Sequence, residues 1–360
     1  MAWGISMENI CLEGKTILIT GATGFIGYSL IKHLFNITKS VNIIGIDNMN
    51  NYYDVNLKEN RLSVISKYEG FKFIKGNIAD KKLVMDIFKQ NKPHIVVNLA
   101  AQAGVRYSII NPDAYIESNL LGFYNILESC RHSYDNDERG IEHFVYASSS
   151  SVYGANKKIP YNTRDKTDYP SSLYAATKKS NELMAYTYSK LYNIPSTGLR
   201  FFTVYGPYGR PDMAYFDFTN KLLKGKKIRI FNYGKCKRDF TYIDDVVEGI
   251  VRVMKKFPDK KTREDGFLLP PYKLYNIGNS HPENLLDFVN ILQQELVYAG
   301  LLPENYDFEL YKELVPMQPG DVDVTYADVT EFEKDFGFKP SVGLKEGLRR
   351  FVKWYKEFYR

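Results

Sequence analysis

The chain has 360 residues, of which 44% are hydrophobic and 25% are charged, so wholesale disorder is excluded and one large or two tightly joined domains are expected. The 48 Lys and Arg residues exceed the 42 Asp and Glu residues and give a net charge of +6. These charges are dispersed rather than clustered, which argues against a nucleic-acid partner and suits a small anionic ligand better.

Cysteines and histidines form no recognisable ligand pattern. The three cysteines, Cys11, Cys130 and Cys236, include no CxxC pair, and the five histidines show no HxxxH or HxH spacing. We therefore expect no disulfide framework and no metal site. Residues 1–15 lack the basic-then-apolar pattern of a signal peptide, and no window approaches the roughly 18 consecutive apolar residues of a membrane span. These patterns predict a cytoplasmic protein with no membrane partner.

The first half of the chain alternates short apolar strands with helical patterns. Predicted strands cover 16–20, 41–46, 71–75, 95–99 and 144–147, and predicted helices run through 30–34 and cover 56–67, 83–89 and 117–131. Near-continuous apolar strands separated by amphipathic helices are typical of a parallel sheet that is covered on both faces. The pattern predicts a doubly wound α/β domain of the Rossmann type.

The second half is more mixed and has no clear linker. Its patterns predict a long helix over 173–192, strands over 196–203, 228–231 and 274–277, helices over 244–255, 285–298 and 344–359, and a surface loop over 257–273. We therefore expect a smaller substrate-binding domain interleaved with the last strands of the sheet. The expected division is an amino-terminal extension over 1–13, a nucleotide-binding domain over 14–200 and about 240–278, and a substrate domain over 201–239 and about 279–360.

A glycine-rich turn follows the first predicted strand. Gly21, Gly24 and Gly27 are spaced G-x-x-G-x-x-G, with a helix after them and Asp47 at the end of the next strand. Glycines let the backbone approach a pyrophosphate, which a helix N-terminus stabilises, while the carboxylate accepts hydrogen bonds from an adenosine ribose. Because the charge of Asp47 would repel a 2′-phosphate, the pattern predicts NAD rather than NADP. The alternative is a glycine turn that only packs the helix on the strand.

Tyr174 and Lys178 are four residues apart in the long predicted helix, so their side chains share one face. An ammonium group beside a phenol favours the phenolate, so we expect Lys178 to lower the pKa of Tyr174 and make it a general base for a sugar hydroxyl. Ser149 lies 25 residues upstream, in a serine run at the end of a buried strand, where ligands of such sheets bind. With 29 tyrosines a YxxxK pair can arise by chance, and the serine run makes the combination more specific.

Several segments together resemble a known family. The segments are TGATGFIG (20–27), ASSSSVYG (147–154), YAATKK (174–179), RFFTVYGPYGRPDMA (200–214), RDFTYIDDV (238–246) and QPGDVDVTYAD (318–328). They are similar to those of the extended short-chain dehydrogenase/reductase family and, within it, of the nucleotide-sugar epimerases. DNMNNYYDVNLKENRL (47–62) and GVRYS (104–108) are most similar to the UDP-glucuronate 4-epimerases. The resemblance extends from Gly14 to the last helix.

This resemblance implies NAD-dependent 4-epimerisation of UDP-glucuronate to UDP-galacturonate through a transient 4-keto sugar. In this scheme Tyr174 takes the proton of the sugar 4-hydroxyl, Lys178 holds the nicotinamide ribose, and Ser149 hydrogen-bonds the 4-oxygen. NAD is regenerated in each cycle and can stay bound. The resemblance also implies a homodimer that packs through the helix bearing YxxxK.

The resemblance also assigns residues to the two ligands. The expected cofactor-binding residues are Gly21, Gly24, Phe25, Ile26, Gly27, Asp47, Asn77, Ile78, Leu99, Ala100, Ala101, Tyr174 and Lys178. The expected substrate-binding residues are Ser149, Ser150, Ser151, Thr203, Arg210, Arg238, Asp321 and Arg106. Thr203 and Arg210 would grip the sugar carboxylate, Arg238 the diphosphate, and Asp321 would lie near the uridine ribose. An ordinary solvated charge is the alternative for Arg210, Arg238 and Asp321.

The serine run also argues against two related reactions. Dehydratases of this family carry an acidic pair where Ser150 and Ser151 stand, and uronate decarboxylases carry a glutamate at the position of Ser151. One alternative left open is a 4-epimerase of a neutral UDP-sugar such as UDP-glucose or UDP-N-acetylglucosamine. A uronate decarboxylase and a non-catalytic NAD-sensing protein are less favoured.

Asn77 stands where the family usually has an aspartate near the adenine, so we expect an altered adenine contact. Residues 1–13 have no assigned counterpart.

Overall fold

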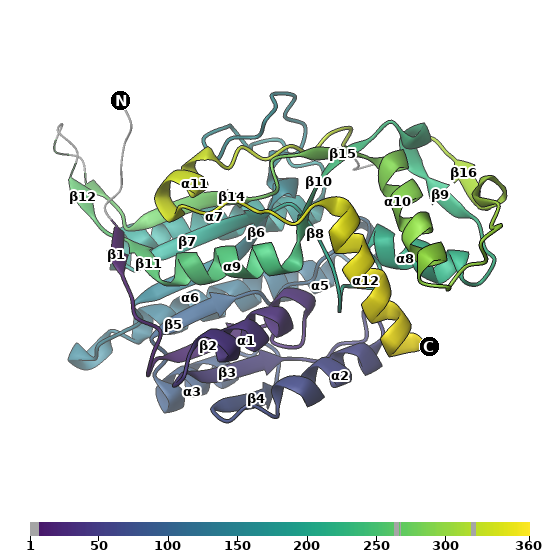
Figure 1. Ribbon diagram of the computed structural model, residues 1–360. Helices are drawn as coiled ribbons and strands as arrows, with labels where there is room; N and C mark the ends of the chain where they lie inside the picture. Colours follow the sequence, from purple (N-terminus) through teal and green to yellow (C-terminus); the bar gives the residue numbers. More distant parts are fainter. Residues whose placement is uncertain (1–6, 263–265, 267, 318–321) are drawn as a thin grey trace.

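A seven-stranded parallel sheet forms the centre of the computed structural model, which describes residues 7–262, 266, 268–317 and 322–360 (Figure 1). The strands, in their order across the sheet, are β14 (Tyr272–Ile277), β7 (Ser196–Phe201), β6 (His143–Ser149), β5 (Ile95–Asn98), β2 (Thr16–Thr20), β3 (Asn42–Asp47) and β4 (Phe71–Lys75). The chain moves outward from β2 to β4 and then returns to place β5 on the other side of β2. This reversal opens a crevice at the carboxyl ends of β2 and β5, where ligands of such sheets bind.

Helices cover both faces of this sheet, as the sequence predicts. The alternation along β2 shows why: Ile17 and Ile19 pack into one buried cluster and Leu18 into another, and none is more than 1% exposed. The helices of the first face are α1 (Phe25–Ile37), α2 (Val55–Ile65), α9 (Ile243–Met254) and α11 (Thr330–Phe336). Those of the second face are α3 (Lys81–Asn91), α6 (Gly122–His132) and α7 (Leu173–Tyr192). The doubly wound prediction is confirmed.

The single strand predicted over 196–203 is instead two strands in different sheets. β7 ends at Phe201 because both of its neighbours end there, with Ser149 of β6 and Ile277 of β14 paired to that residue. The chain then leaves the central sheet, and β8 (Thr203–Tyr205) pairs in parallel with β10 (Lys237–Tyr242), which also pairs with β15 (Pro282–Asn284). This departure carries residues 203–213 over the end of the sheet.

The remaining elements form a smaller lobe, seen at the right of Figure 1, and several short pieces. The lobe contains α8 (Ala214–Leu222), α10 (Leu285–Tyr298), α12 (Leu344–Tyr359), and the parallel strands β9 (Ile228–Ile230) and β16 (Lys312–Leu314). The short helices and turns are α4 (Tyr107–Ile110), α5 (Asp113–Tyr115), η1 (Ile116–Leu121), η2 (Asp135–Asp137), η3 (Ser150–Tyr153), η4 (Phe231–Gly234) and η5 (Phe308–Tyr311).

The stretch predicted as a surface loop over 257–273 contains strands. β11 (Lys256–Pro258) pairs with β1 (Met7–Asn9), and β12 (Lys261–Thr262) pairs with β13 (Leu268–Leu269). Residues 7–9 of the segment expected to be an unassigned extension therefore form a separate two-stranded sheet with the chain that follows α9. The two-domain division stays a prediction. Among the described helices, none combines the length and apolar character needed to cross a bilayer.

Candidate active site

A cleft runs along the carboxyl edge of the central sheet, at the crevice beside β2 and β5. Its wall includes the glycine turn after β2, Asp47 at the end of β3 and Tyr174 at the start of α7. Every residue predicted to bind the cofactor lines this cleft: Gly21, Gly24, Phe25, Ile26, Gly27, Asp47, Asn77, Ile78, Leu99, Ala100, Ala101, Tyr174 and Lys178. The fold thus gathers the whole predicted cofactor set in one place.

The glycine turn leaves no room for side chains and exposes a helix N-terminus. A Cβ added to Gly27 would lie 2.2 Å from the carbonyl oxygen of Gly21, and one added to Gly21 would lie 2.9 Å from the nitrogen of Ala100. Helix α1 begins directly after Gly24, and neither a capping side chain nor an acidic residue occupies its first turn. Its free N–H groups and dipole suit a phosphate, so the turn fits the diphosphate of a dinucleotide.

Asp47 and Lys58 line the cleft next to this turn. The carboxylate of Asp47 is 9% exposed and accepts hydrogen bonds from the backbone nitrogens of Thr23 (3.1 Å) and Met49 (2.9 Å), which fix it beside the turn. Lys58 Nζ donates to the backbone and side-chain oxygens of Asn50, both at 2.7 Å. Burial lowers the pKa of Lys58. Lys58 is absent from the predicted cofactor set, although it lies within the segment 47–62 that carried the resemblance.

Asn77 has both ends of its amide engaged. Its Nδ2 donates to Glu117 Oε1 (2.8 Å), and its Oδ1 accepts from the backbone nitrogen of Ala79 (3.0 Å). The amide therefore shapes the turn ahead of α3 while one of its faces still lines the cleft. An aspartate at this position would place its carboxylate against that of Glu117. The asparagine that stands in place of the family's usual aspartate therefore suits its neighbour, to which it donates a hydrogen bond.

Tyr174, Lys178 and Ser149 meet between α7 and the end of β6. Ser172 caps α7 through a 3.1 Å hydrogen bond from the nitrogen of Ala175, which fixes the turn that carries Tyr174. Lys178 Nζ, one turn further on, donates to the carbonyl oxygen of Ala147 (2.9 Å), and Ser149 Oγ accepts from the nitrogen of Ser151 (3.1 Å). Ser149 and Tyr174 line the same part of the cleft.

The expectation that Lys178 lowers the pKa of Tyr174 is wrong. The pKa of Tyr174 is raised, because burial outweighs the hydrogen bond from Ser149 and the charge of Arg210, which both lower it. Burial also lowers the pKa of Lys178 to about 8. The ammonium group donates to the carbonyl oxygen of Ala147, and the charge of Arg210 lowers the pKa of Tyr174 by less than burial raises it.

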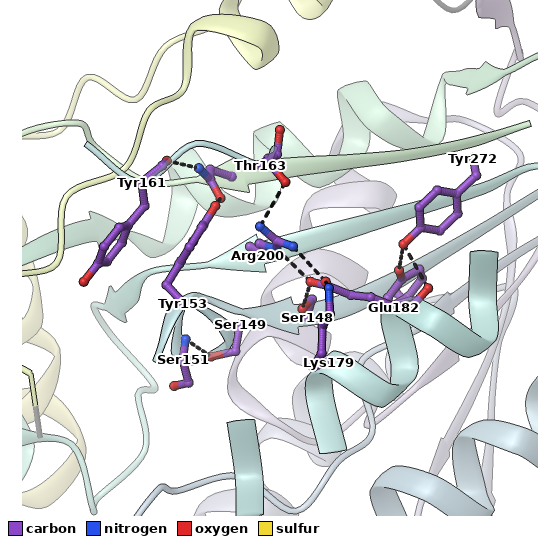
Figure 2. A network of polar contacts seen from close by, with 12 residues as sticks. Ser148, Ser149, Ser151, Tyr153, Tyr161, Thr163, Lys179, Glu182, Arg200 and Tyr272 are labelled. Atoms are coloured by element: carbon purple, nitrogen blue, oxygen red, sulfur yellow. Dashed lines mark hydrogen bonds and ion pairs between the residues drawn. The ribbon is translucent and has the colours of Figure 1, made fainter. Parts of the chain in front are cut away.

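A buried ion pair lies behind these residues (Figure 2). Arg200 of β7 donates from Nε (2.7 Å) and Nη2 (2.8 Å) to the two carboxylate oxygens of Glu182, and the side chains are only 1% and 2% exposed. Ser148 Oγ donates to the same carboxylate (2.7 Å). Since Glu182 lies one turn beyond Lys178 on α7 and Ser148 directly precedes Ser149, this pair ties the helix to the strand end. Sequence reasoning missed it, because two charged residues 18 positions apart show no local pattern.

Arg210 lines the cleft and forms an ion pair with Asp212. It donates from Nε to Asp212 Oδ1 (3.0 Å) and from Nη2 to Asp212 Oδ2 (2.7 Å). Tyr52 Oη donates to Asp212 Oδ2 (3.1 Å) from across the cleft. Neither Tyr52 nor Asp212 was predicted, although both lie in segments that carried the resemblance. A carboxylate ligand of Arg210 would compete with Asp212 or share the guanidinium, which has five N–H donors.

The other predicted substrate residues within the described chain do not line the cleft. Ser150 and Ser151 lie half-buried in η3 and Thr203 half-buried at the start of β8. Arg238 on β10 donates to the carbonyl oxygens of Lys237 and Asp323, both at 3.0 Å, and the exposed Arg106 stacks on the ring of Phe231 at 4.4 Å. Asp321 lies outside the described residues. Of the predicted substrate set, the structure brings Ser149 and Arg210 to Tyr174.

Comparison with known proteins agrees with this geometry. The model of the NAD dependent epimerase/dehydratase family matches residues 17–278. The chain belongs to this family. It is 49% identical to Protein CapI of Staphylococcus aureus (96% of this chain, 99% of that protein) and 44% identical to UDP-glucuronate 4-epimerase 4 of Arabidopsis thaliana (96% and 76%). It is also similar to the solved UDP-glucuronic acid 4-epimerase of Bacillus cereus in complex with UDP-glucuronic acid and NAD (TM-score 0.81, 29% identity, 96% and 100% covered).

NAD is therefore the cofactor that both the family and the cleft indicate, and Gly27 provides a direct test of where it binds. We expect Gly27→Ala to lose bound NAD and at least about 100-fold in turnover, because the new methyl group would displace the turn. NAD released from denatured protein measures the first effect. Gly343→Ala is the control, because a Cβ there meets no atom within 4 Å. Full NAD content in Gly27→Ala would contradict this placement.

Proposed function

We propose that this protein is a UDP-glucuronate 4-epimerase that uses NAD and forms UDP-galacturonate through a transient 4-keto sugar. The observation that carries the proposal is that Arg210 lines the same cleft as Tyr174, Lys178 and Ser149. In a uronate the carboxylate is attached to carbon 5, next to the reacting carbon 4. A sugar whose 4-hydroxyl meets Tyr174 then brings its carboxylate toward a cation. The relatives named for UDP-glucuronate support this choice of substrate.

The side chains of this cleft supply the proton transfers. The glycine turn and Asp47 would hold NAD, which would supply the acceptor for the hydride of carbon 4 and the donor for its return. Tyr174 removes the proton of the 4-hydroxyl and later returns one to the 4-oxygen. Ser149 hydrogen-bonds that oxygen, and Lys178, with a pKa of about 8, is a nearby donor that Ala147 holds in place. We assign Asp47 to the adenosine ribose and the glycine turn to the diphosphate.

The remaining substrate contacts are proposals of the same kind. We assign Thr203 to the sugar carboxylate, Ser150 and Ser151 to the sugar, and Arg238, Arg106 and Asp321 to the nucleoside diphosphate. Movements on binding must bring these groups to the ligand, since those in the described chain are not among the residues that line the cleft.

The role of Arg210 can be tested by removing its charge. We expect Arg210→Ala to lower kcat/KM for UDP-glucuronate about 100-fold or more, because a charge-assisted contact in a closed site is lost and Asp212 is left without its partner. Turnover of a neutral UDP-sugar, where measurable, should fall far less. Chromatography of reactions with UDP-glucuronate and UDP-glucose gives both values. Equal losses for the two sugars would remove the proposed role.

Substrate choice itself is tested with the unchanged protein. Incubated separately with UDP-glucuronate, UDP-glucose and UDP-N-acetylglucosamine, it should convert the uronate at least about tenfold more efficiently than either neutral sugar. Conversion of UDP-glucose without conversion of the uronate would refute the proposal and favour the neutral-sugar alternative.

We further propose a homodimer in the cytoplasm. Large apolar side chains are exposed on the neighbouring helices α6 and α7, among them Leu183 (57%), Leu191 (61%) and Tyr186 (37%). Such a face is typical of an interface between copies of a chain. The three cysteines are free, in keeping with a reducing compartment. Sedimentation at micromolar concentration tests the assembly, and a mass of one chain would refute it.

A further inference from the structure

Arg61, on α2, is a fully buried cation with no role in the proposed reaction. It is 0% exposed, and it belongs to the segment 47–62 that carried the resemblance to the UDP-glucuronate 4-epimerases. All four of its hydrogen-bond acceptors within the described residues are neutral oxygens, and its Nε is buried without a partner there. Burying an arginine without a carboxylate is costly, so the contacts that it makes need an explanation.

Those contacts join the two loops that form the ligand site. Arg61 Nη1 donates to the carbonyl oxygen of Thr23 (2.8 Å), which lies inside the glycine turn, and to Tyr53 Oη (2.7 Å). Its Nη2 donates to the carbonyl oxygens of Tyr208 (2.6 Å) and Gly209 (3.1 Å), which directly precede Arg210. The planar guanidinium thus links two segments: Nη1 donates to the cofactor turn, and Nη2 donates to the loop that carries Arg210.

The loop that Arg61 holds is one that needs external support. Tyr208 has a φ of 58°, a left-handed conformation that is unfavourable for a residue with a Cβ. A second tether from the same segment reaches the loop beyond Arg210, where Tyr52 Oη donates to Asp212 Oδ2 (3.1 Å). Arg210 is therefore fixed from both sides by residues of the segment 52–61.

We propose that Arg61 is a positioning residue that fixes the Arg210 loop relative to the cofactor turn. The guanidinium that binds the substrate carboxylate is thereby held at a defined position relative to the bound dinucleotide. This rests on the proposed function, because it assigns Arg210 to the substrate carboxylate. Lysine cannot replace Arg61, because the donors of an ammonium group all lie on one nitrogen. A planar guanidinium carries donors on separate nitrogens and can reach the cofactor turn and the Arg210 loop at once. Loosening the link displaces Arg210 and leaves the uridine and diphosphate contacts in place.

The test compares the uronate with UDP, which lacks the carboxylate. With NAD added to saturation, Arg61→Lys should lower kcat/KM for UDP-glucuronate about tenfold, while the inhibition constant of UDP changes less than about twofold. Arg252→Lys is the matched control. That arginine also donates to a backbone carbonyl, of Phe336 (3.0 Å), but lies on α9 outside the cleft lining, and both constants should stay unchanged.

If Arg61→Lys raised the UDP inhibition constant in parallel with the loss of kcat/KM, or changed neither constant, the proposal would be overturned. A residue that only stabilises the fold would affect binding of UDP and of the uronate alike. If Arg61→Lys does not fold, Tyr53→Phe removes one acceptor of the fork and should give a smaller loss of about threefold that is again confined to the uronate. No loss in Tyr53→Phe would also overturn it. The proposed function is tested separately, by whether the unchanged protein converts UDP-glucuronate at all. The role of Arg61 is tested by the kcat/KM of the variant divided by that of the unchanged protein.

Discussion

Replacing Tyr174 with phenylalanine should lower turnover of UDP-glucuronate by at least about 1,000-fold while bound NAD is retained. The change removes only the hydroxyl, so the proton of the sugar 4-hydroxyl loses its acceptor. The glycine turn and Asp47, which lie on other elements of the cleft wall, are untouched. Initial rates measure the loss, and NAD released from the denatured variant shows whether the cofactor site survives.

A neighbouring tyrosine offers the matched control. Tyr115 packs edge-on against Tyr174, with ring centroids 6.1 Å apart, but its hydroxyl donates to the carbonyl oxygens of Ala103 and Gly104. Tyr115→Phe should stay within about tenfold of the unchanged rate, because it removes structural hydrogen bonds and no proton acceptor. Retained activity in Tyr174→Phe, or an equal loss in the two variants, would contradict the assignment of the base.

Breaking the buried ion pair behind the site should give the largest loss of stability. Arg200→Met leaves the buried Glu182 carboxylate with the more distant and partly exposed ammonium of Lys179 (3.7 Å) as its remaining cationic partner among the described residues, and the free energy of unfolding should fall by about 3–5 kcal/mol. Turnover should fall as well, because the pair fixes α7 against the strand that carries Ser149. Urea unfolding monitored by circular dichroism measures the first effect.

The double variant Arg200→Met/Glu182→Met separates charge from packing. Removing both charges should recover most of the lost stability, since no fully buried charge is then left without its main partner and Lys179, which also contacts Glu182, is partly exposed. Lys82→Ala, which breaks the exposed Lys82–Asp86 pair, should give no resolvable change. If the double variant were no more stable than Arg200→Met, the loss would come from packing rather than from the unpaired charge.

Local patterns allowed much of the fold to be predicted. The strand over 16–20 and the helices over 173–192 and 285–298 have the predicted bounds, because uninterrupted apolar runs and helical periodicity mark them. The split after Phe201 could not be predicted, because the run from Ser196 to Thr203 continues without interruption. What ends β7 is the length of its neighbours β6 and β14, which is a property of the assembled sheet.

The candidate site divides in the same way. The cofactor residues lie next to the glycine turn or at strand ends, so their grouping follows from the topology of a parallel sheet. The pairing of Arg210 with Asp212, the Arg200–Glu182 pair and the contacts of Arg61 all depend on side-chain directions in the packed chain. The expected effect of Lys178 on Tyr174 was wrong for a related reason, because helical spacing places two groups on one face without fixing how each is solvated or directed.

Proton NMR of the reaction run in D₂O is the most direct test of epimerisation at carbon 4 by hydride removal and return. UDP-glucuronate should give UDP-galacturonate that carries protium at both carbon 4 and carbon 5, with no lasting absorbance at 340 nm and no release of carbon dioxide. This result is expected because the hydride never exchanges with solvent, while only the oxygen-bound proton passes through Tyr174. Deuterium at carbon 4 or carbon 5 of the product, or no uronate product at all, would contradict the account.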